Sequence, residues 1–198
     1  MRLNEKKLIE KYISDDINIT NGIDIGCGPK IKNKDNCDGQ EFQNILLGID
    51  KNKDFEPDLC CDALDINKYF KDSSIKLAIM VHVLEDLENP YEVLRRLVRL
   101  LAKNGILIII CPYRGRYPRI GTKNANGGHK FDYEPYDIEY MIWRTFVKQK
   151  RNYEIEIFEN LECDSFGVVV KKKFDKLDYS YWPGWQMCDD DGSIPNKK

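Results

Sequence analysis

Short apolar runs recur along the chain, separated by polar stretches rich in turn-forming residues. The runs at 75–81 and 106–110 are almost entirely apolar, which is typical of strands covered on both faces of a sheet. Shorter runs of the same kind end at Asp50 and Cys61 or precede Gly26. This pattern predicts five strands in chain order, over 23–25, 45–50, 58–61, 75–81 and 105–111.

Segments whose apolar residues recur at helical spacing lie between or beside these strands. A stripe of Val93, Leu94, Leu97, Val98 and Leu101 follows Asn89, a good N-cap, and Pro90, which suits the first helical position, so a helix begins there. Similar spacing predicts amphipathic helices over 3–14 and 135–146. Alternating patterns over 153–158 and 166–170, joined by a short connection, predict an antiparallel pair.

Five strands joined by crossovers form an α/β, doubly wound and mostly parallel sheet, whose strands leave their carboxyl ends at one edge. Four polar residues fall at or just beyond those ends: Asp24, Asp50, Asp62 and His82. Ligands bind at this edge in open α/β sheets. The joint placement of these residues therefore predicts a binding site there.

The segment Asn21–Lys30 contains the most informative turn. A strand that stops at a glycine-rich turn is how α/β proteins approach a nucleotide-like ligand with their backbone. Gly26 and Gly28 match the first two glycines of G-x-G-x-x-G, but Ile31 stands at the third position. Asp50 lies 24 residues after Gly26, near the spacing expected of an acid that accepts hydrogen bonds from a ribose.

Two segments resemble a known family. D-x-G-x-G-P at Asp24–Pro29, and H-V-L-E-D at His82–Asp86 after the fourth strand, resemble class I methyltransferases that depend on S-adenosylmethionine (SAM), of the small type 11 group. The resemblance covers residues 20–173 and implies a Rossmann-like, seven-stranded sheet that closes with a C-terminal antiparallel hairpin. It implies SAM as cofactor, held by Asp24, Gly26, Cys27, Gly28, Asp50, Lys51, Asp62, Ala63, Val81 and His82.

In the family the first acid holds the amino group of SAM, the second the ribose and the third the adenine. The chain departs from the family pattern at Asp86, where a second histidine usually stands, and over 30–44, which lacks the periodicity of a helix. Its two histidines, His82 and His129, both fall on the expected active-site side and are the candidates for a catalytic base. His129 ends a long, basic loop over 111–130, expected to be a substrate loop or lid.

Composition and absent motifs argue against several classes of function. The 198 residues carry a net charge of −2, and no [N/D]-P-P-[Y/F] motif follows the fourth strand, which argues against a nucleic-acid acceptor. Seven cysteines without a C-x-x-C pair indicate no metal site and favour a reduced, cytoplasmic setting. The N-terminus has no signal-peptide pattern, and no apolar run is long enough to cross a membrane.

We therefore expect one methyltransferase domain over 1–173, with a tail over 174–198, acting on the oxygen or nitrogen of a small-molecule or sugar acceptor. Two alternatives remain open. One is a methyltransferase-like protein that binds partners without catalysis. The other is an NAD-dependent oxidoreductase, against which Ile31 and the C-terminal hairpin both argue.

Overall fold

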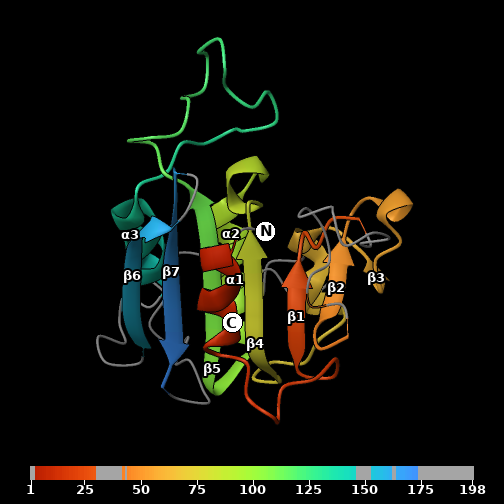
Figure 1. Cartoon of the computed structure of the whole chain (residues 1–198). Helices are drawn as coiled ribbons and strands as arrows, with labels where there is room; N and C mark the ends of the chain where they lie inside the picture. Colours follow the sequence, from red (N-terminus) through yellow and green to blue (C-terminus); the bar gives the residue numbers. More distant parts are fainter. Residues whose placement is uncertain (1–2, 30–41, 43, 146–152, 162–163, 174–198) are drawn as a thin grey trace, which may run out of the picture.

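A computed structural model describes residues 3–29, 42, 44–145, 153–161 and 164–173 of the chain (Figure 1). Seven strands form one sheet in the order β3-β2-β1-β4-β5-β7-β6. The neighbours from β3 to β5 are parallel, and β7 is antiparallel to both β5 and β6. The strands are β1 (Gly22–Ile25), β2 (Leu47–Asp50), β3 (Leu59–Cys60), β4 (Ile75–Val81), β5 (Leu101–Pro112), β6 (Tyr153–Leu161) and β7 (Ser165–Lys172).

This arrangement confirms the predicted fold class: a doubly wound, mostly parallel sheet of seven strands that ends in an antiparallel hairpin. All five strands predicted before the hairpin are present, and β4 has the predicted bounds. β5 begins at Leu101, four residues earlier than predicted. The strand absorbs this extension through a left-handed residue at Asn104 and a register shift against β4.

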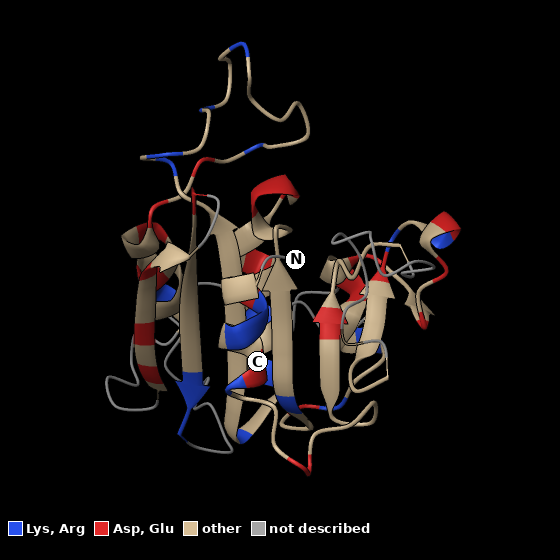
Figure 2. Cartoon of the chain, viewed as in Figure 1, with Lys and Arg blue, Asp and Glu red and all other residues tan. Residues whose placement is uncertain are grey.

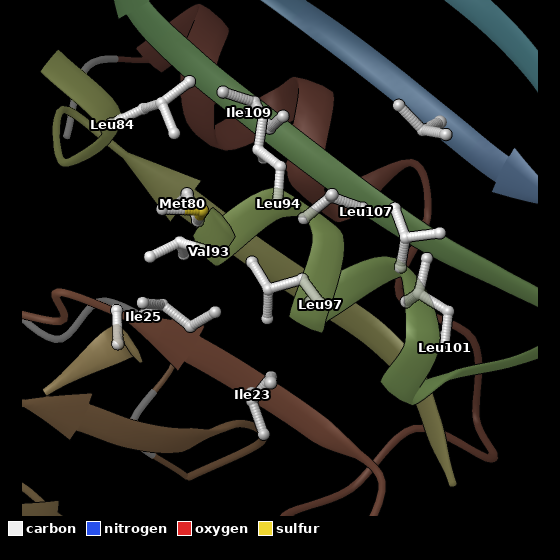
Figure 3. Close-up of a cluster of buried hydrophobic side chains, with 14 of the residues drawn as sticks. Ile23, Ile25, Met80, Leu84, Val93, Leu94, Leu97, Leu101, Leu107 and Ile109 are labelled. Atoms are coloured by element: carbon white, nitrogen blue, oxygen red, sulfur yellow. The ribbon is translucent and has the colours of Figure 1, made fainter. Parts of the chain in front are cut away.

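Helices cover both faces of the sheet. α2 (Pro90–Leu100) packs with α3 (Pro135–Thr145) and the short 3-10 helix η2 (Ala63–Lys68) on one face. Figure 3 shows Val93, Leu94 and Leu97 of α2 facing Met80 of β4 and Ile109 of β5. α1 (Leu3–Glu10) lies on the other face, where its Leu8 and Ile9 join a second buried cluster.

β4 shows how the two layers share one strand. Ala78 and Met80 belong to the cluster with α2, whereas Leu77 and Ile79 belong to the cluster with α1, as the alternation of side chains along a strand requires. All four are fully buried. The near-continuous apolar run that predicted a central strand is therefore the consequence of coverage on both faces.

The helix α2 begins as its sequence predicts. The Asn89 side chain accepts a hydrogen bond from the backbone N–H of Glu92, and Pro90 occupies the first turn. On the exposed side, Arg95 and Arg96 both pair with the Glu92 carboxylate, and Arg99 pairs with Asp72. The predicted helix over 3–14 is shorter, because α1 ends at Glu10. The predicted tail at 174–198 and most of 30–44 lie outside the described residues.

The glycine turn after β1 is closely packed. Gly26 and Gly28 have φ angles of +67° and +68°, a region that favours glycine. The backbone N–H groups of Gly26 and Cys27 both donate to the carbonyl of Ile49, at 2.7 and 3.1 Å. A Cβ at Gly26 would overlap the side chain of Val83, which follows β4. The turn therefore depends on glycine for both its conformation and its space.

Replacing Gly26 by alanine is expected to destabilise the protein by about 2–4 kcal/mol, because backbone strain and overpacking add. Thermal or urea unfolding measures the loss. Gly121→Ala is the matched control, since Gly121 also has a positive φ of +82° but no neighbour within 4 Å of the added Cβ. The control should lose only the backbone strain, about 1–2 kcal/mol. Equal losses in the two variants would contradict the close packing against Val83.

Candidate active site

The polar residues at the carboxyl edge of the sheet come from β1, β2, β4, the 3-10 helices η2 and η3 (Leu84–Asp86), and the loop after β5. Figure 2 shows acidic residues, coloured red on the ribbon, at the ends of β1 and β2 and around η3. The arrangement brings residues that are far apart in the sequence to one edge, as the parallel topology predicts.

Asp50, the last residue of β2, is tied to the glycine turn. Its Oδ2 accepts a hydrogen bond from the backbone N–H of Gly28 at 3.1 Å. Its Oδ1 accepts from the N–H of Asn52 at 2.8 Å. These two bonds fix the direction of the carboxylate at the edge of the site while leaving further lone pairs for a ligand.

Asp24 lies in β1 next to this carboxylate and is 6% exposed. Burial, together with the nearby charge of Asp50, raises the pKa of Asp24 to about 7. Burial is also the main reason that the pKa of the Cys27 thiol rises to about 12. Cys27 is therefore a neutral lining residue of the turn and a poor nucleophile.

Asp62 begins η2, and its side chain accepts a hydrogen bond from the N–H of Leu64 at 2.8 Å. Ala63 is nearly buried beside it. Asp62, Lys51 and Leu64 line a cavity of about 50 Å³. Its other lining residues are Asp86, Leu87, Glu88, Asn89, Val93 and Lys130.

His82 immediately follows Val81, the half-buried last residue of β4, and has a left-handed φ of +55°. Its Nε2 lies 3.0 Å from Oε1 of Glu5, a fully buried carboxylate of α1 that also accepts from the hydroxyl of Ser165. Burial alone would lower the pKa of His82, but Glu5 and then Glu85 outweigh it and raise the pKa to about 9. His82 is therefore protonated at neutral pH and connects α1 to the site.

His129 reaches the same edge from the loop after β5. The loop is closed at its base by a bridge between Tyr113 and Tyr133 and rises above the sheet (Figure 1). Its far end is held to η3, because the N–H groups of Lys130 and Phe131 both donate to the carbonyl of Glu85. The His129 side chain is only 7% exposed, and its Nε2 lies 3.9 Å from Oε1 of Glu85.

The basic residues of the loop are partly engaged elsewhere. Arg114 pairs with Glu134 at 2.8 Å, and the guanidinium of Arg116 lies over the ring of Tyr113. Lys130 pairs with Glu88 at the rim of the cavity. The loop therefore contributes its anchored end, rather than its tip, to the site.

Sequence reasoning assigned no role to Glu5 or to Glu85. Glu5 precedes Leu8 and Ile9 by three and four residues, so the helical spacing that predicted α1 also places Glu5 on its buried face. Glu85 lies inside the H-V-L-E-D segment, but nothing in the sequence alone shows that its side chain is buried.

Within the described part of the chain, no group of three or more histidine, cysteine or acidic side chains has the geometry to hold a metal ion. The described cysteines Cys27, Cys60, Cys61 and Cys111 are free thiols. A search of the described residues also finds no helix long and apolar enough to cross a membrane.

Comparison with known proteins identifies a related domain. Residues 23–109 match the family model described as a methyltransferase domain. No curated protein matches the chain.

Several solved structures share the fold at low sequence identity. A SAM-dependent methyltransferase from Archaeoglobus fulgidus is 17% identical, with a TM-score of 0.63 over 85% of this chain and 93% of its own. A possible histamine N-methyltransferase from Thermotoga maritima is 14% identical, with a TM-score of 0.57 over 86% and 88%. An N-methyltransferase from Haemonchus contortus, in complex with phosphomonomethylethanolamine and S-adenosylhomocysteine, is 13% identical, with a TM-score of 0.59 over 86% and 52%.

The strand order, the glycine turn and the matched domain agree with one another. Residues 23–109 therefore match a methyltransferase domain, and the described chain shares the fold of solved SAM-dependent methyltransferases.

Proposed function

We propose that this methyltransferase transfers the methyl group of SAM to a small-molecule acceptor, at the carboxyl edge formed by β1, β2 and β4. The observation that carries the proposal is the hydrogen bond between Asp50 and the backbone of Gly28. It joins the acid at the end of β2 to the glycine turn after β1, so that one ligand can contact both. A protein that only binds partners would have no need of this arrangement.

The residues fit the cofactor. Asp24 offers a buried carboxyl group whose pKa is already raised, so a positively charged amino group beside it would restore its charge. The positive φ angles of Gly26 and Gly28 shape the turn so that the backbone N–H of Gly28 meets Asp50 at the end of β2. We assign the ribose to Asp50 with Lys51, the adenine to Asp62 with Ala63, and contacts along the rest of the ligand to Cys27, Val81 and His82. SAM, when bound, supplies an activated methyl group.

The cavity beside Asp62 is smaller than the several hundred Å³ of most ligand pockets. Its lining includes Asp86 of η3, Val93 of α2 and the ion pair of Lys130 with Glu88. We infer that this surface ion pair opens when the cofactor enters. Exposed pairs of this kind contribute only about 0–1 kcal/mol, so opening costs little.

His129 is the better of the two candidate bases. His82 holds a proton at neutral pH because of Glu5 and Glu85, so it has no lone pair to accept another. His129 is buried at the end of the loop and near Glu85, which can orient its imidazole ring. The protein's own residues would thus position the acceptor and take up its proton.

A small acceptor suits the domain, which we assign to residues 1–173. Both N-methyltransferases with the same fold are named for small amine substrates or contain one. The slightly negative net charge supplies no general attraction for nucleic acid. A sugar hydroxyl is the second candidate, because a histidine base serves hydroxyl groups best.

Asp50→Ala is expected to weaken binding of S-adenosylhomocysteine by about 2 kcal/mol, or roughly 30-fold, because hydrogen bonds to the ribose are lost. Calorimetric titration measures the change, and thermal unfolding checks that the variant folds. Asp54→Ala, at a neighbouring exposed aspartate in η1 (Lys53–Phe55), is the control and should bind as the wild type does. Unchanged affinity in Asp50→Ala would remove Asp50 from the ribose site.

Binding of S-adenosylhomocysteine is expected to release a proton below pH 7. The free protein keeps Asp24 protonated up to about pH 7, because burial raises its pKa above the ordinary 3.8. The ligand's amino group favours the charged carboxylate, so affinity should rise about 10-fold from pH 6 to pH 8. The raised pKa also affects the free energy of unfolding. Protonated Asp24 stabilises the folded protein at low pH, and this contribution is lost as the pH rises from about 4 to about 7.

Calorimetry in two buffers of different ionisation enthalpy measures this proton release, and Asp24→Asn should abolish it. Release that persists in Asp24→Asn would assign the proton to another group.

His129→Ala is expected to reduce turnover by about 10²–10⁴-fold while the affinity for S-adenosylhomocysteine stays within about twofold. Turnover is measured as conversion of SAM in a mixture of small amines, alcohols and sugars, and added imidazole should restore part of it. Lys123→Ala, at an exposed residue of the same loop, is the control. Wild-type turnover in His129→Ala would exclude a base at this position.

A further inference from the structure

The carboxylate of Glu85 is buried without a hydrogen-bond partner. The residue is 1% exposed, and within the described structure neither Oε1 nor Oε2 makes a hydrogen bond. A buried carboxylate without partners is costly, and such groups occur where a ligand or a function requires them. The backbone of Glu85 is nonetheless well fixed, because its carbonyl receives two N–H groups from the end of the loop.

Other polar groups surround the Glu85 carboxylate. Oε1 lies 3.6 Å from Nδ1 of His82 and 3.9 Å from Nε2 of His129, both beyond hydrogen-bond distance. Asp86 Oδ1 and the Tyr133 hydroxyl are likewise buried and lack hydrogen bonds to any described residue. The cluster thus combines groups from η3, the end of β4 and the end of the loop, and most of them accept hydrogen bonds.

The positive charge near Glu85 is insufficient. His82 makes its short contact with Glu5 at 3.0 Å, so one imidazolium faces two fully buried carboxylates. The backbone N–H of Lys130 donates to the Glu85 carbonyl, but its ammonium group is paired with Glu88. Asp86 adds a further acid, whose pKa is raised by burial and by the charge of Glu85. A cation beside Glu85 would complete the balance of charge.

We propose that Glu85 receives the protonated amine of the methyl acceptor, so that the enzyme is an N-methyltransferase of small amines. The inference rests on the proposed function, since it names the acceptor of the same site. Asp86 and Tyr133 offer further acceptors for the N–H groups of the amine. His129 then takes a proton from nitrogen, and the freed lone pair forms the N–CH₃ bond as the electron pair of the breaking C–S bond stays on sulfur.

The loop links amine binding to closure of the site. In the closed arrangement the N–H groups of Lys130 and Phe131 hold the loop end against η3, which buries Glu85. Closure without an amine leaves the Glu85 carboxylate without a hydrogen bond to any described residue, beside a His82 imidazolium that also contacts Glu5, whereas closure over an amine would supply a hydrogen-bonded cation. A cationic acceptor beside Glu85 would therefore stabilise the closed state further.

Glu85→Gln separates this function from a structural role, because it removes the charge and keeps the shape. In the free protein the variant should unfold about 2–4 °C higher than the wild type, since a buried charge without a hydrogen bond in the described structure is gone. A structural ion pair with the histidines would make the variant equally or less stable, and that result would overturn the proposal. Glu159→Gln, at an exposed residue of β6, is the matched control and should leave the unfolding temperature unchanged.

Transfer of labelled methyl groups from SAM tests the acceptor class directly. The probes are ethanolamine, putrescine and benzylamine, compared with ethylene glycol, butanediol and benzyl alcohol. We expect label in the amines, and about 100-fold less transfer by Glu85→Gln than by Glu159→Gln. Label in the alcohols alone, or in no amine, would overturn the inference.

Binding of S-adenosylhomocysteine, measured on the same samples, distinguishes a wrong acceptor class from a wrong cofactor. Retained binding with transfer to alcohols contradicts only the amine acceptor. Loss of binding in the wild-type protein contradicts the proposed function as a whole.

Discussion

The contact between Val83 and Gly26 is the constraint from which the site follows. β4 is packed on both faces, so the chain leaves it in a fixed direction, and Val83 then occupies the space that any side chain at position 26 would need. The glycine turn must adopt positive φ angles beneath it. That turn points the N–H of Gly28 at Asp50, while the turn of the backbone at His82 directs its imidazole to Glu5. One close contact therefore aligns the ends of β1, β2 and β4.

Among the described residues, acidic groups at this edge of the sheet outnumber the positive charges that face them. Asp50, Glu5 and Glu85 bring negative charge to this edge, and the His82 imidazolium balances only part of it. Asp24 adds a buried acid that stays protonated up to about pH 7. Such an arrangement is costly in the free protein, as the raised pKa of Asp24 shows. Proteins tolerate unfavourable groups of this kind where a ligand repays the cost. The ammonium group of the cofactor would neutralise one part of this edge, and a protonated amine acceptor would neutralise another.

Much of the fold could be predicted from the sequence, because the apolar runs of β4 and β5 and the stripe of α2 reflect burial directly. The acids at strand ends could be predicted as well, since topology alone places them together. The partners of His82 could not, because Glu5 is 77 residues away and the contact depends on how α1 docks. The burial of the Glu85 carboxylate without a hydrogen-bond partner among the described residues also depends on tertiary packing. The start of β5 was misplaced because Gly105 resembles a helix stop, whereas the turn occurs within the strand, at Asn104.

Calorimetric titration of the wild-type protein with S-adenosylhomocysteine, and with NADH for comparison, tests the central claim most directly. Both ligands suit a strand that ends in a glycine turn, but only the first suits Asp24, Asp50 and Asp62 together. The account predicts micromolar binding of S-adenosylhomocysteine and none of NADH. Binding of NADH alone would contradict it in favour of an oxidoreductase, and binding of neither would leave the acidic edge without its ligand.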